Sequence, residues 1–239
     1  MRIKVIVYVL LLGAGLQAQT VQVSPYAKNY PHLLYLEKAK IHFGFFIGTN
    51  ISHYRFERST VDAYAGTDIT GVSQKAGVGL TVGLLGEWHI LPLLSLRLVP
   101  DFSLESRSLV FDTQTYGGYV AEKQTLDYAS FNVPLMLKFR SVRLNDFALS
   151  FLVGAGWGVD ISSRKEDPLQ INWVFPNRHY GFISLGTAFD FHLQFFKLGV
   201  EFRYDIGLNN LLPNNPSEYG QGLKSLNNHA LRILLSFEG

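Results

Sequence analysis

The chain has 239 residues and a formal net charge of +2, so it is long enough for one large domain and has no bulk charge that would attract a nucleic acid. It contains no cysteine, which excludes disulfides, thiol chemistry, cysteine-based metal sites and a lipid anchor on cysteine. Charged residues make up 17%, below the typical ~25%, while aromatic residues reach 14% and glycines number 22. This composition fits a protein with much apolar outer surface and close backbone packing.

The start of the chain predicts export. Arg2 and Lys4 make the start basic, Ile3–Leu12 is otherwise apolar, and small residues lead to Ala18, so we expect a signal peptide over 1–18. The apolar run is shorter than the about 20 residues that a transmembrane helix needs. Residues 19–40 are polar and contain two prolines, which predicts a loosely ordered periplasmic leader. The third predicted unit, over 41–239, is the main domain.

Apolar side chains alternate with small or polar ones in eight segments of the main domain. Alternation with a period of two over such lengths predicts β-strands, and membrane-spanning strands need about 9–11 residues. The predicted strands cover approximately 41–56, 75–90, 94–111, 127–139, 147–162, 180–193, 196–208 and 229–237.

The gaps between these strands alternate strictly between long and short. The long gaps fall near 57–71, 113–126, 163–178 and 209–228, and the short ones near 91–93, 141–146 and 194–195. Every tight turn therefore lies at one end of the sheet and every long loop at the other. This pattern predicts an all-β fold, an eight-stranded antiparallel transmembrane β-barrel of the outer-membrane type with short periplasmic turns and long external loops.

The alternation alone leaves open which face meets lipid, because a soluble lipocalin-like barrel has the same pattern with an apolar interior. Charges of both signs follow one another closely on the polar face, which also carries many glycines, and this favours a polar, packed lumen. We expect a structural network of paired charges there, rather than a conducting pore, since eight strands enclose only enough space for side chains. The network is predicted to comprise Arg97, Asp101, Glu105, Arg107, Lys197, Glu201, Arg203 and Asp205.

Two further features refine the barrel prediction. Pro100 and Pro134 lie inside predicted strands, where proline removes a ladder donor, so we expect bulges or local strand ends at both. Aromatic residues near the predicted strand ends are interpreted as interfacial girdles, and they are Trp88, Trp157, Tyr180 and Tyr204.

The sequence predicts no catalytic, cofactor-binding or metal-binding residues. Its seven histidines are scattered, with no metal-binding spacing and no nucleophile-base-acid pattern. An outer-membrane enzyme remains an alternative, in which His53 and His179 approach each other near the outer ends of their strands. In the preferred interpretation both are interfacial or loop histidines, and the protein is not an enzyme.

Several segments resemble the PorT family of outer-membrane barrels. They include Leu96–Pro100 with Ser106–Leu109, Asn132–Arg143 with its proline and Leu-x-Leu-Lys sequence, and Asp160–Lys165 with its Asp-x-x-Ser-Arg-Lys sequence. Shorter matches occur over Ile41–Phe45 and Gly207–Leu211. The resemblance extends from about residue 41 to the end of the sequence, and generic barrel patterning would not produce its most specific segments.

This resemblance implies a component of the Por, or type IX, secretion system of didermal bacteria, which in gliding relatives is tied to surface motility. The family brings no catalytic residues, and an eight-stranded barrel is too narrow for folded cargo, so an accessory or assembly role is expected. Expected partners are outer-membrane lipids and other secretion-system proteins. Four basic positions match the family, and they are Arg140, Arg143, Arg164 and Lys165. They are expected either to contact a partner or lipid headgroups, or to act as plain anchors at the membrane interface. The alternative non-enzymatic function is a structural or adhesive barrel.

Overall fold

The computed structural model describes residues 39–58, 68–115, 118–144, 146–162, 176–212 and 223–239. The predicted signal peptide over 1–18 and nearly all of the predicted leader over 19–40 lie outside these ranges, so both remain predictions. None of the described residues forms a helix that is long and apolar enough to cross a membrane.

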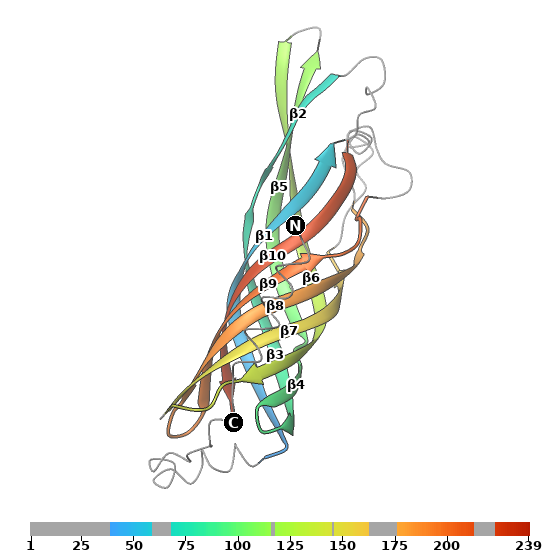
Figure 1. The fold of residues 1–239 in the computed structure, drawn as a ribbon. Helices are drawn as coiled ribbons and strands as arrows, with labels where there is room; N and C mark the ends of the chain where they lie inside the picture. Colours follow the sequence, from blue (N-terminus) through green and yellow to red (C-terminus); the bar gives the residue numbers. More distant parts are fainter. Residues whose placement is uncertain (1–38, 59–67, 116–117, 145, 163–175, 213–222) are drawn as a thin grey trace.

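All regular structure in the described residues is β-strand, and every strand pairing is antiparallel (Figure 1). The strands are β1 (Ile41–Arg58), β2 (Asp68–Lys75), β3 (Gly77–Leu91), β4 (Leu94–Leu98), β5 (Asp101–Thr115), β6 (Gly118–Arg140), β7 (Phe147–Asp160), β8 (His179–His192), β9 (Lys197–Gly207) and β10 (Leu223–Glu238). The sequence predicts this order and class of elements.

The ten segments form eight barrel strands, because β2 continues into β3 past one residue and β4 continues into β5 past two. Around the ring β1 is followed by β10, β9, β8, β7, β6, then β4 with β5, and finally β3. The ring closes between β1 and β3, which pair from Ile41↔Trp88 to Ser52↔Gly77. The predicted eight-stranded antiparallel barrel is therefore confirmed.

The two strand prolines lie beside each other and explain the break between β4 and β5. Val99 N donates to Pro134 O at 3.1 Å, and Leu84 N donates to Pro100 O at 3.0 Å. The reciprocal bonds would need N–H groups that proline lacks. The local strand end expected at Pro100 is present, whereas β6 runs through Pro134 without a shift in its pairing with β7.

The sequence predicts a long irregular loop over 113–126, and this prediction is wrong. β5 and β6 remain paired from Asp101↔Asn132 to Thr115↔Gly118, and the hairpin they form projects well beyond the rest of the barrel (Figure 1). β2 pairs with β5 in the same projection. A strand outside the membrane has no apolar face to maintain, so its sequence loses the alternation from which the other strands are predicted.

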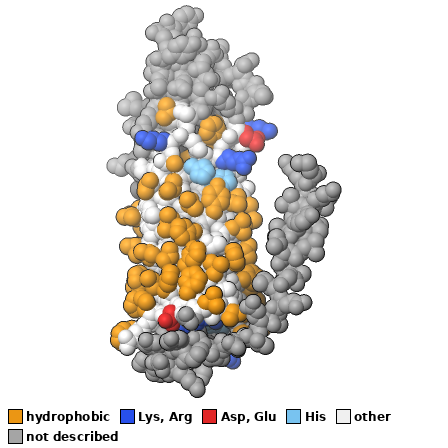
Figure 2. Space-filling model, turned by 60° about the vertical axis from the view of Figure 1, so that its left-hand side comes forward, with side chains coloured by type: hydrophobic (Ala, Val, Ile, Leu, Met, Phe, Trp, Pro, Cys, Tyr) orange, Lys and Arg blue, Asp and Glu red, His pale blue; other side chains and the backbone are white. Residues whose placement is uncertain are grey.

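The outer wall is apolar and the inner face is polar. Apolar side chains cover the middle of the barrel as a broad belt, with basic side chains and histidines at its upper edge (Figure 2). Examples on the exposed face are Phe43, Leu80, Leu84 and Phe151, each more than half exposed, whereas the alternate residues are buried. This arrangement is the reverse of a soluble lipocalin-like barrel, and it fits a wall that faces lipid.

Aromatic side chains packed over glycines help to fill the lumen. A Cβ atom added to Gly83 would lie 2.4 Å from Cζ of Phe46, and one added to Gly156 would lie 2.5 Å from Cζ of Phe182. Phe46 and Phe182 are both buried inside the barrel. The inward-facing glycines therefore make room for rings where a larger residue would collide with them.

Candidate functional site

The charged lumen is the most elaborate polar site in the described residues, and Arg97 on β4 lies at its centre. Arg97 Nη1 donates to Glu201 Oε2 on β9 at 2.9 Å, and Nη2 donates to Glu238 Oε1 on β10 at 2.8 Å. Its Nε lies 3.6 Å from Glu87 Oε2 on β3. One guanidinium, only 1% exposed, thus joins three carboxylates from three other strands.

Two lysines complete this lower part of the network. Lys138 Nζ on β6 lies 2.7 Å from Asp190 Oδ2 on β8, and Lys197 Nζ on β9 lies 2.5 Å from Glu238 Oε2. Both ammonium groups also approach Glu87 Oε2, at 3.6 Å and 4.0 Å. The side chains are buried, so these charges are held by one another rather than by water.

A second group of ion pairs lies further along the lumen, between β5, β9 and β10. Arg232 binds two carboxylates, with Nη1 2.9 Å from Asp101 Oδ1 and Nε 2.6 Å from Asp205 Oδ2. Arg203 lies between the same two acids, at 3.7 Å and 3.5 Å. Asn132 Nδ2 also donates to Asp101 Oδ1 at 2.8 Å, so Asp101 is contacted from several strands.

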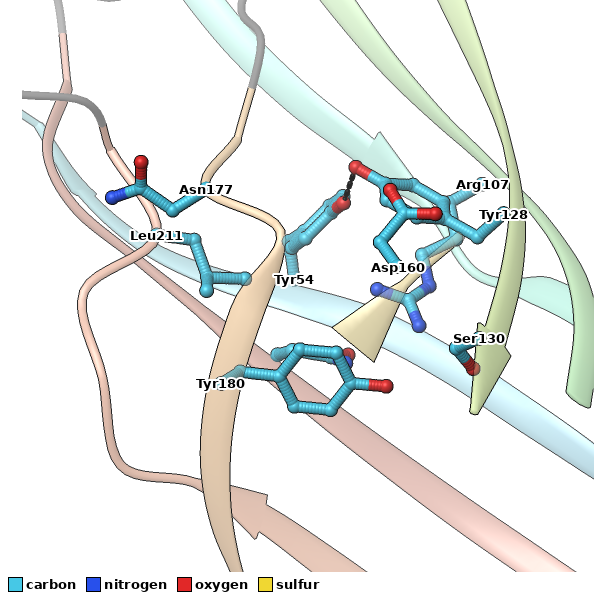
Figure 3. Close-up of a pocket in the computed structure, with 9 residues that line it drawn as sticks. Tyr54, Arg107, Tyr128, Ser130, Asp160, Asn177, Tyr180 and Leu211 are labelled. Carbon is cyan, nitrogen blue, oxygen red and sulfur yellow. Dashed lines mark hydrogen bonds between the residues drawn. The ribbon is translucent and has the colours of Figure 1, made fainter. Parts of the chain in front are cut away.

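An aromatic and arginine cluster occupies the end of the lumen that bears the long connections (Figure 3). The guanidinium of Arg107 lies 5.0 Å from the ring centroids of both Tyr54 and Tyr128, and it also pairs with Glu105. The two tyrosine hydroxyls hydrogen-bond to each other. Stacking of a cation on two rings, together with a carboxylate partner, fixes this arginine across the lumen.

The space beside this cluster is small. Its volume is about 10 Å³, enough for about one water molecule, and its lining includes Tyr180 and Leu211. Tyr180 Oη donates to Asn132 Oδ1 at 2.7 Å and so faces the lumen. The expectation that Tyr180 belongs to an outer aromatic girdle is therefore wrong, because it shares the inward face of β8 with Phe182.

The other three predicted girdle residues lie on the outer wall. Trp88, Trp157 and Tyr204 are 51%, 47% and 37% exposed. Trp88 lies near the end of the barrel with the short turns, whereas Trp157 stacks on His179 near the opposite end, with ring centroids 5.5 Å apart. This distribution is typical of aromatic residues at the two membrane interfaces.

The structure places all eight residues of the predicted charge network inside the barrel, where all are buried. It also adds members that sequence reasoning missed, namely Glu87, Lys138, Asp190, Arg232 and Glu238. Each of these is the lone charge, or one of few, in an otherwise uncharged stretch of its strand. Their alternation would have identified them, because each occupies an inward-facing position of its strand, as the neighbouring glycines and serines do.

The proposed pairing of His53 with His179 does not form. β1 and β8 are separated by β10 and β9, a distance of roughly 14 Å at normal strand spacing, and the register places His53 level with Ile183 rather than with His179. His53 instead stacks on His229, its direct cross-strand neighbour, at a centroid distance of 5.5 Å. Both histidines lie on the outer-facing side of their strands.

The four basic positions that match the PorT pattern have different surroundings. Arg140 ends β6, and its Nη2 donates to Pro92 O of the neighbouring turn at 3.4 Å. Arg143 lies in the turn between β6 and β7 and pairs with Asp146 at 2.8 Å. Arg164 and Lys165 lie outside the described residues. The first two are therefore close together at the end with the short turns.

The match to one family model supports the barrel assignment. A family model described as "Outer membrane protein beta-barrel domain" matches residues 17–212. Among solved structures, OprG from Pseudomonas aeruginosa is 11% identical with a TM-score of 0.42, covering 83% of this chain and 94% of that one. Ail from Yersinia pestis, in complex with the heparin analogue sucrose octasulfate, is 14% identical with a TM-score of 0.39, covering 84% and 100%.

LpxR from Salmonella typhimurium is 8% identical with a TM-score of 0.30, covering 82% of this chain and 99% of that one. Similarities this remote carry no statement about activity. A search of curated protein sequences finds no significant match. The family match covers most of the sequence and agrees with the closed ring, the apolar belt and the polar lumen, which place the protein in the bacterial outer membrane. The chain belongs to the outer membrane protein beta-barrel domain family.

Proposed function

We propose that this barrel is a non-enzymatic component of the Por, or type IX, secretion system, with an accessory or assembly role. The proposal is supported by the segments that resemble the PorT family, above all Asn132–Arg143 and Asp160–Lys165. In cells that glide, the same role would connect the barrel to surface motility. The proposal assigns no catalytic residue and no cofactor.

The observation that carries the accessory role is the ion-pair network across the lumen. Arg97 binds Glu201 from the opposite wall, and Arg107 lies between Tyr54 and Tyr128 nearer the outer end. Opening a path for a protein would separate several buried charge pairs, and each separation leaves an uncompensated charge. Secreted cargo therefore does not pass through this lumen, and the barrel acts through its outer wall, its turns or its leader.

The short turns are the strongest candidates for contact with the secretion machinery. They hold Arg140 and Arg143 close to each other at the end that is periplasmic in outer-membrane barrels. Guanidinium groups bind carboxylates and phosphates with two parallel hydrogen bonds, so these arginines suit an acidic partner segment or a lipid headgroup. The Arg143–Asp146 pair is partly exposed, and a competing acid can replace Asp146 at little cost.

A clean deletion in the source bacterium, with a complemented control, tests the proposal. We expect many large secreted proteins to disappear from the medium and their precursors to accumulate in the periplasm, while the outer membrane stays intact. Complementation with the intact chain should restore the profile. An unchanged set of secreted proteins in the deletion strain would reject the secretion role and leave the outer loops as an adhesive surface to examine.

A further inference from the structure

Two histidines and a glutamate meet at the end of the lumen that carries the short turns, and the charge network described above includes the glutamate, Glu87, but neither histidine. His42 on β1 is the direct cross-strand partner of Glu87 on β3, and His89 follows on the same face of β3. The register of two adjacent strands thus brings three metal-ligand side chains together. One ligand atom from each lies within 4.8 Å of the others.

The distances within this cluster fit a tetrahedral metal. His42 Nε2 lies 3.6 Å from Glu87 Oε2, and His89 Nε2 lies 3.7 Å from Glu87 Oε1. Ligand atoms about 2.1 Å from a tetrahedral zinc ion are separated from each other by about 3.4 Å. Small side-chain adjustments therefore suffice for all three to reach one ion.

The hydrogen bonding of His89 supplies a second, independent observation. Its Nδ1 lies 3.1 Å from the carbonyl oxygen of Ala39, and since a carbonyl only accepts, Nδ1 carries the proton. In the neutral ring Nε2 then presents a lone pair toward a carboxylate oxygen of Glu87, an arrangement that is unfavourable unless a cation lies between them. Donation from the second ring nitrogen to a carbonyl is also what orients most metal-ligating histidines.

His42 also has a ring nitrogen whose hydrogen bonding is not satisfied. It is only 6% exposed, its Nδ1 has no hydrogen-bond partner among the described residues, and its Nε2 lies 2.8 Å from Glu238 Oε2. Glu238 is therefore in position to serve as a fourth ligand. Lys197 Nζ lies 3.4 Å from the same nitrogen and already neutralises Glu238, so it is the local group that opposes a metal.

The balance of charge favours an added cation. In the described part of the lumen, the ion-pair network joins seven carboxylates to six lysine and arginine side chains, which leaves one negative charge over. The surplus lies in the half that contains the histidines. There Glu87, Asp190, Glu201 and Glu238 face Arg97, Lys138 and Lys197, while Arg203 of the other half also reaches Glu201 at 3.5 Å.

We propose that His42, Glu87 and His89 form a zinc site at the periplasmic mouth of the barrel, with Glu238 beside it. Two imidazoles and a carboxylate are ligands that zinc accepts, usually with water or a further acid completing the coordination. The site would join β1 to β3 where the barrel closes. It would also hold the chain that enters β1, because His89 N donates to Lys40 O at 2.8 Å beside the Ala39 contact.

Zinc titration of the refolded barrel tests this site. The mature chain without a polyhistidine tag is refolded into detergent micelles, stripped with a chelator and titrated with zinc chloride, and bound zinc is counted after gel filtration. We expect one zinc per chain. His89→Ala should weaken zinc binding by more than about tenfold, because losing a group that only hydrogen-bonds to a metal ligand already costs about that much. The matched control His53→Ala should bind zinc as the native chain does.

X-ray absorption of the zinc-loaded native chain makes the test independent of any variant. The predicted spectrum contains two imidazole nitrogens with oxygen ligands, and the mobility of unheated samples on a detergent gel reports whether His89→Ala folds. Failure to bind one zinc per chain, equal affinity in folded His89→Ala, or a spectrum without two imidazoles would overturn the proposal. If no zinc binds, the surplus negative charge of the lumen is balanced by a proton on the histidines instead.

Discussion

Arg97 on β4 and Glu201 on β9 form a 2.9 Å ion pair between strands that lie four apart in a ring of eight. The pair therefore connects opposite walls of the barrel. Both side chains are buried, and the same guanidinium also binds Glu238. A barrel whose walls are joined in this way has its interior occupied by side chains, which leaves no open path for a folded protein.

Replacing this arginine tests how much the network contributes to folding. Arg97→Gln removes the positive charge and leaves Glu201 and Glu238 buried with fewer partners, which should lower the free energy of unfolding by about 3–5 kcal/mol. Equilibrium unfolding of the refolded barrel in lipid vesicles measures the change. Lys224→Gln breaks an exposed pair with Glu57 and should change stability by no more than about 0.5 kcal/mol. Equal effects of the two substitutions would contradict the structural role of the network.

The packing of rings over glycines predicts a position-specific effect of one added methyl group. In Gly83→Ala the new Cβ meets Cζ of Phe46 at 2.4 Å and the carbonyl oxygen of Pro100 at 2.5 Å, so we expect a loss of about 1–3 kcal/mol. The control Gly86→Ala lies on the same strand, and its new Cβ would only touch the Phe43 ring at 3.6 Å. Thermal unfolding in detergent compares the two, and a fully stable Gly83→Ala chain would show that Phe46 does not pack there.

A charged side chain on the lipid-facing wall should destabilise the barrel more, the closer it lies to the bilayer midplane. Leu84 lies at the centre of β3 and is 66% exposed, so Leu84→Arg places a cation near the bilayer midplane and should cost about 2–4 kcal/mol. Leu144 is comparably exposed in the turn between β6 and β7, and Leu144→Arg should cost less than about 1 kcal/mol. Unfolding in vesicles measures both values. Similar values at the two positions would mean that the apolar belt does not face lipid.

The filled lumen predicts an absence of steady ion conduction. Arg107 between two tyrosine rings and Arg97 between three carboxylates both obstruct the same path. Recordings from the refolded native barrel in planar bilayers should therefore show no stable open level. If stable openings appear in every bilayer that contains the protein, and their number rises with the number of inserted barrels, the filled-lumen description is refuted.

The fold followed from the sequence wherever the membrane imposes its pattern. Alternation in segments such as Phe147–Asp160 and Lys197–Gly207 has a physical cause, since one face meets lipid and the other meets a polar lumen. Beyond the membrane that cause disappears. The sequence of the outer parts of β5 and β6 for this reason predicts a loop, although their backbone pairing continues to Thr115↔Gly118.

The site was predictable only in part, for a different reason. The sequence signal for the lumen network was pairs of charges two or four residues apart on one face of a strand, as in Arg97 and Asp101 or Glu201 and Arg203. Glu87 is the direct cross-strand partner of Arg97 in the β3–β4 hairpin, whereas Glu238 on β10 becomes a neighbour of Arg97 only through ring closure. Which strands meet across a lumen depends on tilt and stagger, and these are not encoded in any single strand.

Rapid depletion of the barrel in the source bacterium, followed by pulse labelling of cargo, tests the secretion role most directly. The account predicts that labelled precursors stop at the periplasm as soon as the barrel is lost, while other outer-membrane proteins still assemble, and that restoring the intact chain releases the block. Cargo that continues to reach the medium at its normal rate after the barrel has disappeared would contradict the account.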